Sequence, residues 1–432
     1  MKNLNKEDYK ICIVGLGYVG LPLAARFSLK GFDVTGFDIK EERINQLVNK
    51  IDINNDISDT NLETLVKNSK LTSNIDEIKG CDIFIITVPT PINDDKTPDL
   101  EPLIASSKLV GSIIKKGSIV IYESTVYPGV TDEICTPILE EKSCLIFNKE
   151  FSTGYSPERI VPGDKVNTIE KIKKVVSASN EETLKIISFL YSSIIEAGIH
   201  ETPSIKVAEA AKVTENIQRD VNIALINEMH QLYTSLDIST LDVIEAASTK
   251  WNFMKLTPGL VGGHCISIDP YYLMHKSEMS GYTPHIMQAS RKVNDDMSKW
   301  VVEKFLKFSS KNNDKMNISI LADSVESLIG ALYLDGGFKN AKKFIKSTWS
   351  PYFDIEEKNM QDPKTKLQEL SQQKIKKLPD YKLIKKEGPS HSPIFTVSLK
   401  VLNLKKIITS GSTIREAEKN AASIALKHIN EN

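Results

Sequence analysis

Long apolar runs and cysteine are scarce in this 432-residue sequence. No apolar run reaches the roughly 18 residues that a membrane span requires, and residues 1–10 are polar and charged, unlike a signal peptide. The five cysteines are an odd number without the spacing of zinc ligands, which argues against a disulfide scaffold and favours a reducing compartment. We therefore expect a cytoplasmic protein that does not associate with membranes.

Net charge is also small, but it is unevenly distributed. The chain totals −1, yet residues 362–432 hold 14 Lys and Arg against 7 Asp and Glu, which leaves 41 against 49 for residues 1–361. Such a division indicates that the two parts meet different partners, and nucleic acid is the simplest candidate for the basic part. The length predicts about three domains.

The first motif is a glycine turn between a strand and a helix. An apolar, β-prone run, residues 9–14, leads into Gly15-Leu-Gly17-Tyr-Val-Gly20 and then into residues at helical spacing. Glycines let a pyrophosphate approach the free N–H groups of the helix N-terminus. A second strand ends at Asp38, whose carboxylate suits ribose hydroxyls and repels a 2′-phosphate. This combination predicts an NAD site.

Alternating strands and helices continue to about residue 200, as in a doubly wound α/β sheet. Residues 81–88 run into Pro89-Thr90-Pro91, and residues 118–122 run into Glu123-Ser-Thr125. Ligands bind at the carboxyl ends of strands in such sheets, although either loop alone would pass for an ordinary turn. The loop with Glu158 and Arg159 is either an active-site element or a solvated surface pair.

A long Ala-rich helix over residues 204–229 places Glu209, Lys212, Asn216 and Arg219 on one narrow face. The helix is apolar on most other sides, which predicts burial. Unpaired polar groups are costly to bury, so the stripe indicates either a site or an internal ion-pair network.

The stretch over residues 257–272 combines Gly262 and Gly263 with Cys265 and Asp269. Glycines would let the backbone pass close to a bound molecule, and a thiol beside a carboxylate can act as a nucleophile. The alternative is that Cys265 is a small buried hydrophobe, the commoner fate of a free cysteine.

Together these motifs resemble the UDP-sugar 6-dehydrogenases over about residues 8–306, and most closely the branch acting on UDP-N-acetylhexosamines for surface polysaccharides. The matching segments are Gly15–Gly20, Val88–Pro91, Glu123–Gly129, Tyr155–Arg159, Glu209–Asn216 and Gly262–Asp269. The resemblance implies oxidation of the sugar C6 alcohol of UDP-GlcNAc or UDP-GalNAc to the carboxylate, with NAD as cofactor, by a homodimer.

The resemblance also implies roles for individual residues. Asp269 and Lys212 would act on the alcohol, and Cys265 would form a thioester that water activated by Glu158 hydrolyses. Thr125 and Asn216 would order that water and the oxyanion. The residues implied to bind NAD are Gly15, Gly17, Gly20, Asp38, Arg43, Thr90 and Thr125. Those implied to bind the UDP-sugar are Arg159, Lys212, Asn216, Arg219 and Gly262.

Beyond residue 308 the resemblance changes. Residues 320–337 predict an amphipathic helix that ends at a glycine. This helix resembles the last metal-binding helix of ribonuclease III, and the resemblance implies that Asp323 and Glu326 lie beside Mg²⁺. The alternative is that these two acids lie on a solvated helix face. The rest of that metal site has no counterpart, so we expect no ribonuclease activity. Residues 362–430 resemble a double-stranded-RNA-binding domain of order α-β-β-β-α, although Thr413 and Ile414 stand where the family usually presents lysines.

The predicted organisation is an NAD-binding Rossmann domain over 1–200, an all-helical central catalytic and dimerisation domain over 201–308, a linker with partial ribonuclease III-like helices over 309–361, and the RNA-binding-like domain over 362–432. Three interpretations stay open. The chain is a dehydrogenase with an RNA-binding tail, an RNA-binding or ribonuclease III-related protein with a vestigial dehydrogenase, or the product of gene fusion or misassembly with neither full activity.

Overall fold

The computed structural model describes residues 4–160, 166–261, 266, 268–311, 318–353, 362–388, 393–402 and 404–430. The chain divides into two compact units, Met1–Leu321 and Ala322–Asn432, each described by itself below.

The first unit is built on an eight-stranded sheet in the order β3-β2-β1-β4-β5-β6-β7-β8. Neighbouring strands are parallel except β6 and β7, which are antiparallel. The strands are β1 (Lys10–Val14), β2 (Asp33–Phe37), β3 (Lys70–Thr72), β4 (Ile83–Ile86), β5 (Ser118–Tyr122), β6 (Phe151–Tyr155), β7 (Lys174–Ala178) and β8 (Ile199–Glu201).

Helices cover both faces of this sheet. They are α1 (Gly20–Leu29), α2 (Glu41–Val48), α3 (Asp59–Asn68), α4 (Glu101–Gly111), α5 (Thr136–Ser143) and α6 (Glu181–Ile194), with short helical turns at Lys6–Asp8, Ile75–Glu77, Thr131–Cys135 and Ile169–Lys171. In β1, Ile11 and Ile13 join one buried apolar cluster, whereas Cys12 and Val14 join the other. Alternate side chains of a strand point to opposite faces, so the central strands read as continuous apolar runs.

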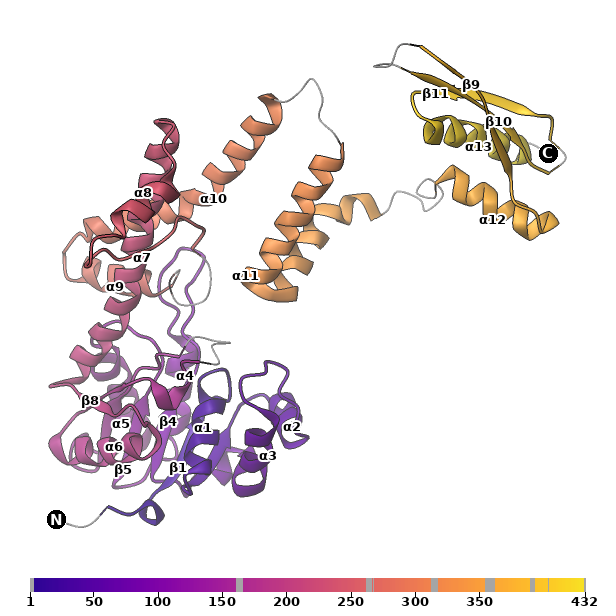
Figure 1. Cartoon of the computed structure of the whole chain (residues 1–432). Helices are drawn as coiled ribbons and strands as arrows, with labels where there is room; N and C mark the ends of the chain where they lie inside the picture. The colour runs from indigo at the N-terminus through magenta and orange to yellow at the C-terminus, as the bar shows by residue number, and fades with distance from the viewer. Residues whose placement is uncertain are drawn as a thin grey trace. The chain divides into compact units, whose positions relative to one another are not determined.

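The helical part of the first unit is organised by α7 (Ile205–Ser235), which runs out of the sheet region towards α8 (Thr240–Ala247), α9 (Asp269–Met279) and α10 (His285–Lys311) (Figure 1). Asp220 of α7 is fully buried and accepts hydrogen bonds from Arg291 and Asn294 of α10 at 2.6 and 2.8 Å. This buried charge is therefore paired, as burial of an ion requires.

The expectation that α7 is buried on most sides is only partly right. Ala208, Val213 and Ala224 are buried, whereas Leu225 and Leu232 are 50% and 53% exposed. Part of the apolar surface of this helix is therefore not covered by the described residues of its own unit.

The second unit contains most of α11 (Ile318–Phe353), followed by α12 (Pro363–Ile375), β9 (Asp380–Glu387), β10 (Ile394–Lys400), β11 (Ile407–Gly411) and α13 (Ile414–Asn430). The predicted glycine stop is a kink: Gly337 has φ 67° and ψ −177°, and helix resumes beyond it.

The three strands form an antiparallel sheet in the order β11-β10-β9. A small core joins it to the helices through Leu367 of α12, Leu399 of β10, Ile407 of β11 and Ala421 of α13. The α-β-β-β-α order predicted for residues 362–430 is confirmed. Among the described residues, no helix has both the length and the apolarity needed to cross a membrane.

Candidate active site

The glycine turn between β1 and α1 is held by close packing. A Cβ on Gly20 would lie 1.9 Å from the carbonyl oxygen of Gly15 and 2.4 Å from Oγ1 of Thr87, so only glycine fits there. Gly15 has φ +97°, a value that favours glycine. A Cβ on Gly17 would meet no heavy atom within 4 Å. The turn is therefore closely packed at Gly20 and open at Gly17, and such an opening is what close approach of a pyrophosphate requires.

Thr87, which follows β4, is a part of this turn that sequence reasoning missed. Its hydroxyl donates to the carbonyl oxygen of Gly15 at 2.8 Å, across 72 residues of chain. Because a threonine after an apolar strand is common, the sequence holds no signal for this contact.

Asp38 lies at the end of β2, beside the turn. Its carboxylate accepts hydrogen bonds from the backbone N–H of Leu16 and of Lys40, both at 2.9 Å. Arg43 donates to the carbonyl oxygen of Leu16 at 3.0 Å and to Asp52 at 3.0 Å. Arg43 thus supports the glycine turn from the side, and its guanidinium is engaged within the protein.

A cavity of about 550 Å³ opens at the carboxyl ends of β1, β2, β4 and β5. It brings together residues that are far apart in sequence. Its lining includes Gly15, Gly17, Asp38, Thr87, Thr90, Glu123, Thr125, Glu158, Lys212 and Asp269. In parallel sheets the carboxyl ends meet at one edge, where ligands bind, so several of the residues predicted to bind the nucleotide or to act in catalysis line one cavity.

The two loops that seemed ordinary turns are joined in this cavity. The hydroxyl of Thr90 donates to the carbonyl oxygen of Thr125 at 2.7 Å, and Ser124 donates to that of Val88 at 2.6 Å. The loops after β4 and β5 are thereby fixed against each other, with Thr90 and Thr125 on the cavity wall.

Glu158 is almost fully buried, and both of its oxygens are engaged. Oε1 accepts from the backbone N–H of Arg159 at 2.6 Å and of Ile160 at 2.8 Å, and Oε2 accepts from Nζ of Lys174 at 2.7 Å. Burial opposes ionisation, but Lys174 and these N–H groups outweigh it and lower the pKa of Glu158.

The cation beside Glu158 serves a second carboxylate. Lys174, 2% exposed, also donates to Oε2 of Glu123 at 2.9 Å, and Tyr191 donates to Oε1 of Glu123. Burial raises the pKa of Glu123, against the opposing effect of Lys174. Sequence reasoning missed this group, because a lysine at the start of a strand ordinarily faces solvent.

The polar stripe of α7 has two functions. Lys212 lines the cavity, and Asn216 donates to the carboxylate of Asp269 from α9. Glu209, however, accepts from the backbone N–H of Gly129 at 2.6 Å and of Thr131 at 2.9 Å, so it holds a loop. Burial raises the pKa of Glu209 to about 7 in spite of these hydrogen bonds.

The remaining predicted substrate residues lie at the margin or outside the described part of the chain. Arg159 is half-buried and pairs with Glu215 at 2.8 Å, and Arg219 is exposed on α7. Gly262 and Cys265 lie outside the described residues.

The metal-site prediction is tested only in part. Glu326 is exposed, and the side chain of Asp323 lies outside what the structure describes. Within the described ranges, no group of three or more His, Cys, Asp or Glu could hold a metal ion.

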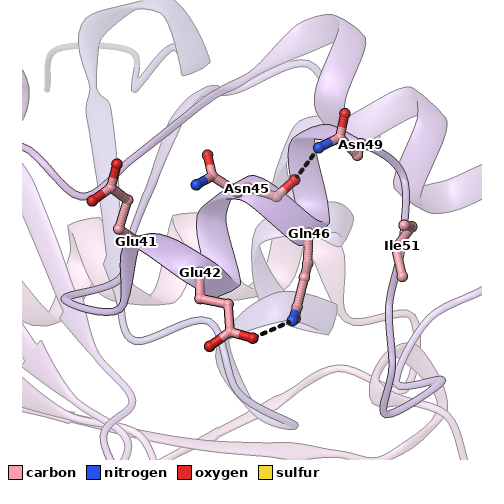
Figure 2. A pocket seen from close by; sticks show the side chains of 6 residues that line it. All are labelled: Glu41, Glu42, Asn45, Gln46, Asn49 and Ile51. Atoms are coloured by element: carbon pink, nitrogen blue, oxygen red, sulfur yellow. Dashed lines mark hydrogen bonds between the residues drawn. The ribbon is translucent and has the colours of Figure 1, made fainter.

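A second, shallow hollow on the outer face of α2 has a different character (Figure 2). Its lining is Glu41, Glu42, Asn45, Gln46, Asn49 and Ile51. Gln46 donates to Glu42 at 3.3 Å, and Asn49 donates to the carbonyl oxygen of Asn45 at 2.8 Å. These are the (i, i+4) contacts of a solvated helix, and we assign them no ligand.

Comparison with known proteins agrees with this geometry. Residues 9–195 match the NAD binding domain of the UDP-glucose/GDP-mannose dehydrogenase family, residues 206–296 match its central domain, and residues 363–429 match the double-stranded RNA binding motif. The chain is 52% identical over 301 residues to the UDP-N-acetyl-D-glucosamine 6-dehydrogenase of Pseudomonas aeruginosa, covering 70% of this chain and 71% of the relative. Protein CapL of Staphylococcus aureus is 52% identical over 297 residues, 69% of each chain.

Solved structures give the same result. The UDP-D-ManNAc dehydrogenase of Pyrococcus horikoshii matches with a TM-score of 0.65 at 30% identity, over 70% of this chain and 72% of that one. The UDP-N-acetyl-mannosamine dehydrogenase Cap5O of Staphylococcus aureus matches with a TM-score of 0.61 at 30% identity, over 70% and 71%.

The glycine turn, Asp38 and the cavity between them define an NAD-dependent oxidoreductase with a Rossmann domain. More particularly, the chain belongs to the UDP-glucose/GDP-mannose dehydrogenase family, and a double-stranded RNA binding motif follows in the same chain. The ribonuclease III-like interpretation of residues 309–361 stays a prediction.

Proposed function

We propose that this chain oxidises C6 of a UDP-N-acetylhexosamine, UDP-GlcNAc or UDP-GalNAc, from the alcohol to the carboxylate. The observation that carries the proposal is the single cavity in which the glycine turn, Lys212, Asp269 and Glu158 converge. The 52% identity to a UDP-N-acetyl-D-glucosamine 6-dehydrogenase supports this choice of substrate. Each of the two oxidations would pass one hydride to a bound NAD, so two NAD would be reduced for each carboxylate formed.

The residues of the chain divide the remaining work. Asp269, held by Asn216, would take the proton of the C6 hydroxyl, and Lys212 would stabilise the developing alkoxide. Cys265 would attack the aldehyde carbon, and after the second oxidation the sugar is a thioester on that sulfur. Water whose proton passes to Glu158 would then attack the carbonyl carbon, break the C–S bond and release the carboxylate.

We further propose that this oxidation is slow. The match to the relatives spans about 70% of their length, 69% for CapL and 71% for the Pseudomonas enzyme. By resemblance, the remainder in those proteins grips the uridine diphosphate. Contacts to remote parts of a substrate position its reacting carbon, so without them kcat falls and KM rises.

The test is a steady-state assay of NADH release with UDP-GlcNAc and UDP-GalNAc, beside a full-length relative under the same conditions. We expect oxidation of one of the two sugars with a much lower kcat/KM than the relative shows. Comparable values would refute the impairment. No NADH from either sugar, with NAD still bound, would refute the substrate assignment.

The second unit supports a second function, binding of double-stranded RNA. The RNA binding motif matches residues 363–429, and α13 packs on β10 and β11 as the α-β-β-β-α order requires. Such domains recognise the shape of A-form RNA through minor-groove and phosphate contacts. A gel-shift titration with duplex RNA and with duplex DNA of equal length tests this function, and equal affinity for the two would contradict it.

A homodimer is part of the proposal. Several large apolar side chains of the helical region are exposed, among them Leu225, Leu232, Leu241 and Trp251, the last at 92%. Apolar surface of this extent on one region indicates an interface.

A further inference from the structure

The hydrolytic carboxylate proposed above is held by a residue that no motif singles out. Lys174 begins β7, two strands from β5 in the sheet order, and is 2% exposed. Its ammonium contacts Oε2 of Glu158 at 2.7 Å and Oε2 of Glu123 at 2.9 Å. A buried ammonium between two buried carboxylates is costly to assemble, so its place beside the cavity invites a functional explanation.

We propose that Lys174 is the positioning residue for Glu158: it fixes the carboxylate at the cavity wall and balances its charge, so that Glu158 can accept a proton from the water that hydrolyses the thioester. The inference rests on the proposed function. In this step the water oxygen bonds to the carbonyl carbon, the C–S bond breaks with its electron pair going to sulfur, and one water proton passes to Glu158.

The geometry leaves Glu158 little freedom to turn. Oε1 is occupied by two backbone N–H groups, so the carboxylate plane is set, and Oε2 is directed by Lys174. Lys174 is held in turn by Glu123, whose other oxygen accepts a hydrogen bond from Tyr191 of α6. Glu158 thus stays oriented without any contact from the substrate.

The charges around Glu158 come from several elements. Lys174 of β7 faces it, Glu123 follows β5, and Tyr191 lies on α6, while Lys212 of α7 and Asp269 of α9 line the same cavity. With one ammonium for two carboxylates, the pKa of Glu158 is lowered and that of Glu123 is raised. Such separation of two neighbouring carboxyl groups is typical of sites that need one of them ionised.

The experiment compares the full chain with K174R, K174M and the double variant K174M/E123Q. The double variant removes one buried cation and one buried anion together, so the net charge of the cluster is unchanged. It also avoids leaving the two carboxylates, Glu123 and Glu158, buried side by side without a cation. Lys206→Met is the matched control, because Lys206 also pairs with a glutamate, Glu133 at 2.8 Å, but on the surface. NADH release is followed from the first turnover with UDP-GlcNAc or UDP-GalNAc, and acid-quenched protein is weighed by mass spectrometry.

We expect K174M/E123Q to release NADH in an initial burst and then to stall, with the sugar thioester visible as added mass on the protein. Hydrolysis should slow about 100-fold at pH 7, the lower end of what a well-placed general base contributes, because Glu158 stays in the site but loses the contact that positions it. The acid limb of its pH profile should move to higher pH, because Glu158 has lost the cation that contacts it directly. K174R should retain most of the hydrolysis, and Lys206→Met all of it.

Other outcomes overturn the inference, in distinguishable ways. Wild-type hydrolysis and an unchanged acid limb in K174M/E123Q would show that Lys174 does not act through Glu158. Loss of the NADH burst together with the thioester, in a variant that still binds NAD, would show a general structural role. No NADH from the unsubstituted chain would refute the proposed function and this role with it.

Discussion

Adding one methyl group at either of two glycines should separate folding from cofactor binding in the turn after β1. In Gly20→Ala, the new Cβ would lie 1.9 Å from the carbonyl oxygen of Gly15 and 2.4 Å from the Thr87 hydroxyl. In Gly17→Ala, it would meet no heavy atom of the protein within 4 Å. The first substitution should therefore damage the protein itself, and the second should damage only the binding of a molecule that lies over the turn.

The magnitudes follow from these distances. Cβ atoms essentially never lie within 3.0 Å of another heavy atom, so the Gly15 carbonyl must move by about 1 Å in Gly20→Ala. That carbonyl also accepts the 2.8 Å hydrogen bond from Thr87. We expect a loss of unfolding free energy of about 3 kcal/mol, the upper end of ordinary overpacking. Gly17→Ala should cost less than about 0.5 kcal/mol in stability, as surface substitutions do, but lower NAD affinity at least about tenfold, or about 1.4 kcal/mol.

The assay pairs urea unfolding with calorimetric titration of NAD for both variants. Gly80→Ala is the control, because its Cβ would also meet nothing within 4 Å and Gly80 does not line the cavity. A Gly17→Ala variant that binds NAD as tightly as the wild type would refute close approach of the pyrophosphate to this turn. An unchanged urea midpoint for Gly20→Ala would refute the packing argument.

Four further predictions concern other parts of the chain. Cys265→Ser should abolish carboxylate production and leave NAD affinity unchanged; normal turnover on UDP-GlcNAc and UDP-GalNAc would remove Cys265 from the mechanism. Burial raises the pKa of Glu209 to about 7 from an ordinary 4.5, so near neutral pH the folded state binds a proton that the unfolded state releases. The unfolding free energy of the wild type, measured against Glu209→Gln, should therefore fall by about 3 kcal/mol as pH rises from about 4.5 to 8. A difference between the two proteins that does not change with pH in urea titrations would exclude this titration. Light scattering at micromolar concentration should show a dimer, and a monomer would leave the exposed Trp251 region unexplained. Duplex RNA should stay intact in Mg²⁺, because metal-dependent hydrolysis needs several converging carboxylates; cleavage that Asp323→Asn removes would overturn this.

Local patterns were enough to predict most of the fold. The turn from Gly15 to Gly20 and the acid at Asp38 were recognisable because strand, turn and helix are neighbours in sequence and each needs a particular residue type. The order α-β-β-β-α over residues 362–430 was likewise legible from short apolar runs and glycine breaks, and the structure confirms it. Helical periodicity also placed Glu209, Lys212 and Asn216 on one face of α7.

Tertiary structure alone decided what those charges do. Glu209 shares a helix face with Lys212, yet it binds backbone N–H groups at Gly129 and Thr131, about 80 residues away in sequence, whereas Lys212 lines the cavity. No sequence pattern singled out Lys174, and only the strand order β5-β6-β7 buries it between Glu123 and Glu158. The periodicity of a helix or strand sets the direction of a side chain, but its charge, burial and role depend on neighbours through space, which the order of strands in the sheet determines.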